Sequence, residues 1–499
     1  MVTLHTNRPD FFNDIAEEIR LFFDMAEVRL AEPGLCEGEA VITAMLNTAG
    51  DPWQGLADVR LLDGRSAAYT EGYPAALGSA LVQKRHQKRC MKIAVFRALR
   101  QLFPNAHLPW GSLTGIRPTR LLRELVALEG PEGAKQTMLN TFDVSPDKLR
   151  LAAEILAAQQ SVFAAQTPQD LDVYIGIPFC ASRCLYCSFA SEVRTAKTDM
   201  SAYLAALKRD IALGAAIARE GGYRIRSMYV GGGTPTVLTC AELADLLRHA
   251  LSCYGGFGLE LTVEAGRPDT IDRQKLELLR GMGVSRISIN PQTMNAATLE
   301  RIGRAHTPQD SCACYALARE VGFDCVNMDI IVGLPGENLD DVRRTLSAIA
   351  AFPTPPENLT VHTLAVKRSS QLKRRLDEFP LPPSAEAEEM VRQSRFAAAG
   401  MGMAPYYMYR QKYMRGNLEN VGYARPHKLC VYNVDMMEET TSIMAHGAGA
   451  MSKRCYAQGP GEDAQNQLRV ERIPNPKDIA SYIAKIEVVG EQKRALFGG

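Results

Sequence analysis

Three cysteines, Cys180, Cys184 and Cys187, follow an apolar strand-like segment at C-x3-C-x2-C spacing. Thiolates spaced in this way on a loop can close around one metal centre. Zinc and iron–sulfur sites usually take four protein ligands, and the sequence offers no fourth ligand nearby. The spacing therefore favours a 4Fe–4S cluster with one open iron, where a small molecule could bind and be reduced. A zinc site completed by a distant histidine, or three cysteines buried in a core, are the alternatives.

A glycine run, Gly231-Gly232-Gly233, ends the next strand-like segment and is followed by Thr234. Without a Cβ, the backbone N–H groups of such a turn can approach a ligand closely and point at a negative group. The turn follows a strand of the same predicted sheet as the cysteine loop. We therefore expect it to bind a carboxylate.

Polar residues also mark the ends of later strands: Glu264, Gln292, Arg304 and Asp329. Asp329 lies inside the apolar segment NMDIIVGLP, where a lone carboxylate costs free energy unless it is paired. Each residue alone could form a structural salt bridge or a helix cap. Together, around one mouth of a barrel, they predict a binding site.

An alternation of strand-like and helix-like segments between about 171 and 370 must position these residues. Strands are predicted at 172–177, 226–230, 259–264, 284–289, 326–332 and 359–364. Helices are predicted between them, at about 199–220, 240–252, 272–282, 308–321 and 338–350. Six β/α repeats imply parallel strands with right-handed crossovers, in an open sheet or an incomplete barrel. The chemistry then lies at the carboxyl ends of the strands.

The first region, residues 1–168, reads as an α+β domain of unknown role. It combines predicted strands at 40–46 and 56–62 with helices at about 11–29, 75–103 and 146–165. Between Gly72 and Arg123 there is no acidic residue, and ten residues are basic. This stretch is either a solvated helix face balanced by acids elsewhere or an anion-facing surface for RNA or a small anion. No RNA-binding signature accompanies it.

The composition is that of a soluble globular protein. The 499 residues are 46% hydrophobic and 23% charged, and 57 Lys and Arg balance 56 Asp and Glu. No apolar run approaches the ~18 residues of a membrane span, and the amino-terminus lacks the layout of a signal peptide. We therefore expect a cytoplasmic location. In that compartment the twelve cysteines are not a disulfide framework.

The motifs resemble the radical S-adenosylmethionine (SAM) superfamily. They most closely resemble its oxygen-independent coproporphyrinogen III oxidase family, of the HemZ type (coproporphyrinogen dehydrogenase). The resemblance covers about residues 171–460. Its motifs are YIGIPFCASRCLYCSFAS, YVGGGTPT, TVEAGRPDTI, RIGRAHT, NMDIIVGLPGE, NLENVGYARPHKLCVYN and MAHGAGAMSK.

The resemblance implies one 4Fe–4S cluster, held by the three cysteines, whose open iron chelates the amino and carboxylate groups of SAM. It implies an enzyme that forms a 5′-deoxyadenosyl radical and takes a hydrogen from a propionate side chain of coproporphyrinogen III. Loss of carbon dioxide and one electron then leaves a vinyl group, giving protoporphyrinogen IX in haem biosynthesis. The residues it places at SAM are Tyr174, Gly232, Gly233, Thr234, Glu264, Gln292, Arg304 and Asp329.

The sequence departs from the family pattern at three points. Gly176 stands where many relatives have histidine, and Phe189 stands where many members carry a fourth cysteine. The His-Asn…Tyr-Trp element of the haem-chaperone branch is not found. These departures leave SAM cleavage intact. A haem-binding or haem-trafficking protein on the same scaffold and a radical SAM enzyme acting on RNA are the alternative functions.

The last region, 371–499, is predicted as a smaller domain that covers the substrate. Its aromatic and basic run at 406–413 could hold a flat macrocycle bearing carboxylates, or it is an ordinary amphipathic strand. Arg410, Lys412 and Arg425 are the predicted partners of the substrate's propionates. The expected fold is a partial (β/α)6 barrel between an α+β amino-terminal domain and this domain. We expect a monomer with a porphyrinogen substrate and an electron-donor protein, but no membrane or nucleic-acid partner.

Overall fold

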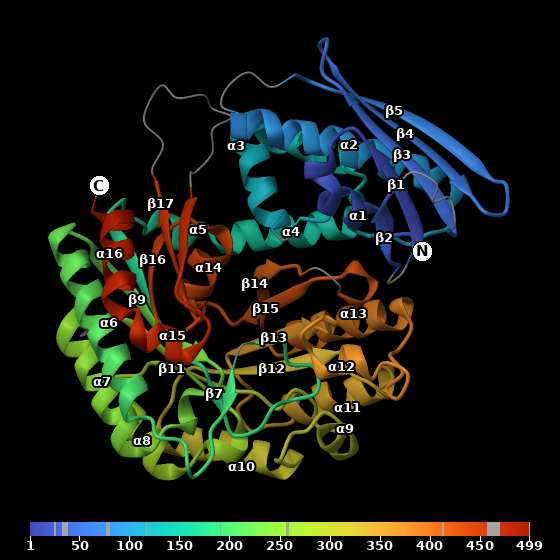
Figure 1. The fold of residues 1–499 in the computed structure, drawn as a ribbon. Helices are drawn as coiled ribbons and strands as arrows, with labels where there is room; N and C mark the ends of the chain where they lie inside the picture. The colour runs from blue at the N-terminus through green and yellow to red at the C-terminus, as the bar shows by residue number, and fades with distance from the viewer. Residues whose placement is uncertain are drawn as a thin grey trace. The chain divides into compact units, whose positions relative to one another are not determined.

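The structure is a computed structural model, and the chain folds into two compact units (Figure 1). One unit contains Met1–Glu154 and Arg410–Leu418. The other contains Ile155–Tyr409, Glu419–Ala457 and Leu468–Gly499. The residues that the structure describes are 1–23, 26–31, 38–75, 80–115, 117–189, 191–255, 259–411, 414–456 and 470–498.

The first unit is a five-stranded sheet with helices, which confirms the α+β class. The sheet order is β2-β1-β3-β4-β5. Its strands are β1 (Val2–Thr6), β2 (Val28–Leu30), β3 (Ala40–Asn47), β4 (Trp53–Leu61) and β5 (Ser66–Tyr73). Its helices are η1 (Pro9–Phe11), α1 (Phe12–Arg20), α2 (Ala80–Leu102), α3 (Pro118–Gln136), the π-helical η2 (Thr137–Thr141) and α4 (Pro146–Ala158), in which the boundary between units falls.

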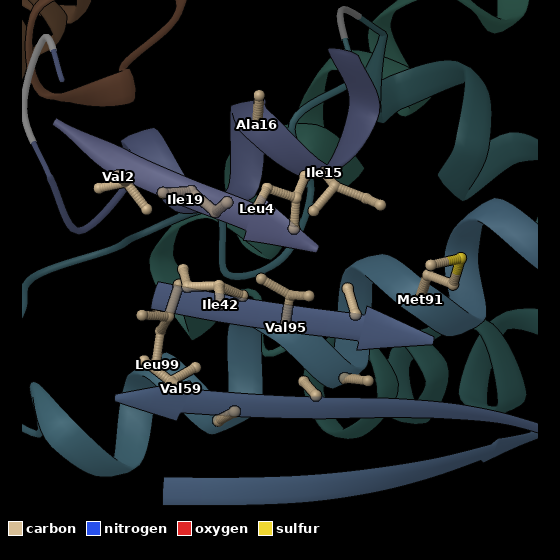
Figure 2. Close-up of a cluster of buried hydrophobic side chains, with 14 of the residues drawn as sticks. Val2, Leu4, Ile15, Ala16, Ile19, Ile42, Val59, Met91, Val95 and Leu99 are labelled. Atoms are coloured by element: carbon tan, nitrogen blue, oxygen red, sulfur yellow. The ribbon is translucent and has the colours of Figure 1, made fainter. Parts of the chain in front are cut away.

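Buried apolar residues of this sheet and these helices form one hydrophobic core. They recur at every second position along the strands and at every fourth position along the helices. Alternate residues of β3 are buried, among them Ile42. Met91, Val95 and Leu99 repeat every four residues along α2 and pack in the same cluster, as Figure 2 shows.

The basic stretch of α2 is matched by acids on α1 and η1. Lys84 pairs with Asp10 at 3.2 Å, and Lys88 pairs with Asp14 at 2.7 Å. Lys92 pairs at 3.0 Å with Glu18, which is fully buried. The lysines and the acids both repeat every four residues, so that each turn of one helix faces a turn of the other. These ion pairs favour the interpretation of the basic stretch as a helix face that is balanced by acids, over its interpretation as a surface for RNA.

The second unit is a large mixed sheet, and its order is β14-β15-β13-β12-β11-β10-β9-β6-β16-β17-β18. The six central strands are parallel: β6 (Asp170–Ile177), β9 (Arg224–Gly232), β10 (Glu260–Gly266), β11 (Arg286–Ile289), β12 (Val326–Val332) and β13 (Asn358–Thr363). All six predicted strands are confirmed to within two residues. The sheet does not close, as expected of a partial barrel.

Helices connect these strands and line the outer side of the sheet in Figure 1. They are α6 (Ser201–Glu220), α7 (Cys240–Tyr254), α8 (Arg273–Gly281), α10 (Pro308–Val321) and α11 (Leu339–Ala350). The short α9 (Ala296–Arg301) lies between β11 and α10, α5 (Gln160–Ala164) precedes β6, and α12 (Gln371–Arg374) and α13 (Ser384–Gly400) follow β13. Capping boxes start α7 at Thr239, α10 at Thr307 and α11 at Asn338. These caps explain why the predicted starts of the three helices agree with the structure. No helix in the described part of the chain is long and apolar enough to cross a bilayer.

The sequence predicts a separate domain after residue 370, whereas the structure continues the same sheet there. The hairpin of β14 (Ala404–Tyr409) and β15 (Asn420–Ala424) pairs antiparallel with β13. At the other edge, β16 (Ser442–His446) pairs parallel with β6. The remaining elements are β17 (Met451–Cys455), β18 (Val470–Pro474), α14 (Val431–Glu438), α15 (Ile479–Ala484) and α16 (Ile486–Phe497). Both edges of the parallel sheet are thus paired by chain from beyond residue 400, and the proline-rich stretch only leads into α13.

Candidate cluster and cofactor site

The cysteine loop begins where β6 ends, at the carboxyl edge of the parallel strands. The short strands β7 (Phe179–Cys180) and β8 (Glu192–Val193) pair across the base of this loop. Leu185 donates its N–H to the carbonyl of Ile302 at 2.9 Å and accepts from the N–H of Leu372 at 2.9 Å. These bonds tie the cysteine loop to the end of α9 and to α12. Leucine side chains from the same loops pack around Leu185 in one buried cluster.

Donors surround two of the three thiols. The hydroxyl of Thr234 lies 3.6 Å from the Cys180 sulfur, and the guanidinium of Arg267 lies 3.6 Å from the Cys184 sulfur. Arg267 is buried and also pairs with Asp269 at 2.8 Å. Metals bind cysteine as the thiolate, and Arg267 places a positive charge beside the Cys184 sulfur. Arg267 was not among the predicted site residues, although it stands in the motif EAGRPD directly after β10.

The three thiols belong to one short loop but differ in burial. Cys184 is buried, and Cys180 and Cys187 are half-buried. Within the described residues, no three histidine, cysteine or carboxylate side chains are grouped so that they could hold a metal ion. Burial raises the pKa of the Cys187 thiol, even though it accepts a backbone hydrogen bond from Phe189.

The glycine run packs against the cysteine loop and against β10. A Cβ on Gly233 would lie 2.9 Å from the Cys180 sulfur, and one on Gly231 would lie 2.9 Å from the Glu264 carboxyl. Gly232 has a φ of 115°, a conformation that strongly favours glycine. Its N–H donates to Glu264 at 3.2 Å. In the structure the Gly232 N–H of this turn therefore meets a carboxylate of the protein itself, and binding of a ligand carboxylate stays a prediction.

Glu264 is the centre of a small polar group inside the sheet. It accepts a hydrogen bond of 2.6 Å from the hydroxyl of Tyr229 in addition to the bond from Gly232. Burial raises the pKa of Glu264 to about 7, and the nearby charge of Asp329 adds to the rise, while the Tyr229 bond opposes it. Glu264 can therefore change its charge near neutral pH.

Asp329, on β12, stays ionised. Burial alone would raise its pKa, but hydrogen bonds from His362 and Asn327 outweigh burial and hold the pKa below its usual value. The Asn327 amide donates at 2.7 Å, and the His362 ring lies 3.5 Å from the carboxylate. His362 is the second-last residue of β13 and also contacts the hydroxyl of Tyr409 at 3.3 Å. His362 was not among the residues predicted at this site.

Gln292 and Arg304 carry buried polar atoms that have no hydrogen-bond partner among the described residues. They are Oε1 of Gln292 and both Nε and Nη1 of Arg304. Gln292 has a φ of 67°, which is rare for a residue with a side chain. Burial would lower the pKa of Arg304, but Tyr186 and Cys184 outweigh it and keep the guanidinium charged. Its remaining Nη2 donates to the Tyr186 hydroxyl at 3.3 Å.

Tyrosine rings stack in a row inside the sheet next to Glu264. Tyr229 and Tyr432 have ring centroids 4.5 Å apart at 22°, and Tyr174 stacks on both at more than 6 Å. Strand alternation puts Tyr174 and Tyr229 on one face. Tyr432 comes from α14, far along the chain, and was not among the predicted site residues, although it stands in the motif NLENVGYARPHKLCVYN.

The structure describes two of the three predicted propionate partners. Arg410 is in the first unit and only 3% exposed, where its guanidinium donates to the carbonyl of Leu113 and to Asn417. Arg425 follows β15 and donates its N–H to the carbonyl of Glu357, just before β13. It is therefore at the amino-terminal edge of the parallel strands, opposite the cysteine loop. Lys412 lies outside the described residues.

Replacing Arg410 by alanine is expected to destabilise the first unit. The guanidinium also lies over the ring of Trp110, with 5.4 Å between its central carbon and the ring centroid. Loss of a buried, hydrogen-bonded charge of this kind costs about 3 kcal/mol. Chemical denaturation of Arg410→Ala against the parent chain measures this cost. An unchanged unfolding midpoint, with weakened substrate turnover, would instead support the propionate role.

Comparison with known proteins agrees with this geometry. Residues 174–349 match the family model of the radical SAM superfamily. The oxygen-independent coproporphyrinogen-III oxidase-like protein HemZ of Bacillus subtilis is 36% identical over 77% of this chain and 76% of its own length. This chain belongs to the radical SAM superfamily, in the oxygen-independent coproporphyrinogen III oxidase family. The heme chaperone HemW of the same organism is 29% identical over 56% of this chain and 69% of its own length.

A solved structure supports the fold of this radical SAM protein. Coproporphyrinogen III oxidase (HemN) of Escherichia coli has a TM-score of 0.50 and 22% identity, over 66% of this chain and 73% of that chain. Radical SAM proteins use a 4Fe–4S cluster and SAM. The donor types present fit both groups, although the three sulfur atoms are not gathered into a metal site within the described residues. Three free thiols share one loop, a glycine turn leaves no room for a side chain beside Cys180, and Arg304 and Gln292 present buried polar atoms without partners.

Proposed function

We propose that the protein decarboxylates coproporphyrinogen III oxidatively to protoporphyrinogen IX, without dioxygen. The observation that supports this most is the 36% identity to the HemZ protein over three quarters of both chains. The row of tyrosine rings beside Glu264 is consistent with it, because a flat tetrapyrrole can pack against aromatic rings. Each propionate would lose carbon dioxide, one hydrogen atom and one electron to become a vinyl group.

When bound, the cluster and SAM supply a 5′-deoxyadenosyl radical that removes the hydrogen atom. We propose that Cys180, Cys184 and Cys187 hold the cluster. Residues of the parallel strands and of the loops near their carboxyl edge would hold SAM in place. They are Tyr174, Gly232, Gly233, Thr234, Glu264, Gln292, Arg304 and Asp329. Leucines of the surrounding loops, buried with Leu185, would keep water from the radical.

The decisive experiment is anaerobic incubation of the reconstituted protein with SAM, a reductant and coproporphyrinogen III. We expect mass analysis to show a product that has lost two carbon dioxide units, together with release of 5′-deoxyadenosine. Release of 5′-deoxyadenosine with unchanged porphyrinogen would refute the decarboxylation and leave the radical chemistry. Release of neither, with SAM bound and the cluster reduced, would refute both.

Haem binding is the second candidate, because a relative that matches this chain over 69% of its own length is named a heme chaperone. A haem carrier would bind haem in a defined ratio and would release 5′-deoxyadenosine without changing coproporphyrinogen III. Titration of the protein with haem, followed by its absorption spectrum, separates the two functions. Absence of saturable haem binding would exclude the carrier.

A further inference from the structure

Two large apolar side chains of the cysteine loop face the solvent. Phe189, two residues after Cys187, is 70% exposed, and Val193 is 44% exposed. Exposed aromatic side chains are common at the centre of protein–protein interfaces. In this chain such a side chain lies next to the residues that hold the cluster.

A strongly basic loop packs against this surface. Between β13 and Asp377 the chain carries five cations and no acid: Lys367, Arg368, Lys373, Arg374 and Arg375. The hydroxyl of Ser369 donates to the carbonyl of Ser188 at 3.3 Å, so the basic loop and the cysteine loop touch one residue away from Phe189. Positive charge is therefore fixed beside the exposed ring.

Acidic residues form ion pairs with most of the basic residues of α2 in the first unit. Some exposed basic residues of the loop at 367–375 have no such ion pair among the described residues. Arg375 pairs with Glu378 at 2.6 Å. For Arg368 and Arg374, both exposed, the structure gives no ion pair with any described residue, and the same holds for Arg183 in the cysteine loop. An apolar centre with an uncompensated basic rim favours an acidic protein partner.

We propose that Phe189, Val193, Arg183, Arg368 and Arg374 form a docking surface for an acidic one-electron carrier protein that reduces the cluster. Each reductive cleavage of SAM consumes one electron. A carrier docked here would be oxidised by one electron and would pass it to the cluster through the adjoining loop. Electron-transfer partners bind through small interfaces and depend on charge for steering, as this surface would allow. The inference rests on the cluster and SAM and not on the identity of the substrate.

The test uses a recombinant flavodoxin, a small acidic FMN protein, as the probe and the full-length reconstituted protein. Two variants carry the same change of charge: Arg368→Glu with Arg374→Glu, and Arg219→Glu with Arg248→Glu on α6 and α7. We expect the first variant to bind flavodoxin about tenfold more weakly or worse at low salt and to lose most of its salt dependence. The second should bind like the parent chain. Iron content and SAM binding should be unchanged in both.

Reduction of the cluster gives a second readout. The first variant should be reduced more slowly by reduced flavodoxin, while photoreduced deazaflavin, a small reductant, should reduce both variants equally fast. Phe189→Ser should weaken flavodoxin binding and leave its salt dependence in place, because it removes apolar contact and no charge.

Two results would contradict the proposed docking surface. The first is equal loss of flavodoxin binding in the two charge-reversed variants, or no loss in either. The second is a raised KM for coproporphyrinogen III in Arg368→Glu with Arg374→Glu, measured with the small reductant, while flavodoxin binding is unchanged. That second result would assign the basic loop to the substrate's carboxylates.

Discussion

Replacing Cys184 with alanine is expected to abolish the cluster and all release of 5′-deoxyadenosine. Anaerobically reconstituted parent protein should bind about four irons per chain and be brown, as a 4Fe–4S site requires. Cys184 is the buried member of the three cysteines, and the guanidinium of Arg267 lies 3.6 Å from its sulfur. Two remaining thiols cannot hold the cluster. Iron analysis, the absorption spectrum and chromatography of the nucleoside products measure these losses.

Cys253→Ala is the control, since Cys253 is also a free cysteine but is half-buried and lies on α7. It should keep the iron, the colour and the nucleoside product. If Cys184→Ala and Cys253→Ala both retained their full iron content, the assignment of the cluster to this loop would be wrong. Bound zinc in the parent chain, in place of iron after anaerobic reconstitution, would equally contradict it.

The central sheet was predictable because its signals are local. Each strand is a short apolar run, and each of the helices α7, α10 and α11 begins at a Thr or Asn that caps it. The carboxyl ends of parallel strands share one edge, which is why Glu264 and Asp329 were expected near one another. The structure agrees, since the charge of Asp329 raises the pKa of Glu264.

The remaining features depend on pairings between distant parts of the chain. Tyr432 joins the tyrosine row from α14, about 200 residues after Tyr229 in the sequence. Arg410 reads as a strand residue able to meet a carboxylate, yet it packs on Trp110. The sheet edges are likewise closed by β15 and β16. No local pattern of apolar spacing, turns or caps encodes which distant segment will pair, so these contacts needed the structure.

The affinity for SAM is expected to fall by about tenfold in total as the pH falls through 7, because protonation removes the charge of Glu264. Burial raises the pKa of this carboxyl to about 7, so the cation SAM meets a carboxylate above that pH and a neutral acid below it. Stability changes in the opposite direction. A carboxyl whose pKa is higher in the folded chain than in the unfolded chain favours folding when it is protonated. This contribution to stability is lost as the pH rises from the ordinary pKa of a glutamate through 7.

Glu264→Gln should flatten the pH profile of the SAM dissociation constant and weaken binding at pH 8 by about tenfold, since a neutral amide replaces a charged acceptor. Glu337→Gln is the matched control. Burial also raises the pKa of Glu337 to about 7, but Glu337 accepts a 2.6 Å hydrogen bond from Thr293 and does not contact Tyr229 or Gly232. Equilibrium dialysis with labelled SAM between pH 5.5 and 8 distinguishes the two carboxyls. A pH step that survives in Glu264→Gln and disappears in Glu337→Gln would move the titrating group, and with it the SAM contact, away from β10.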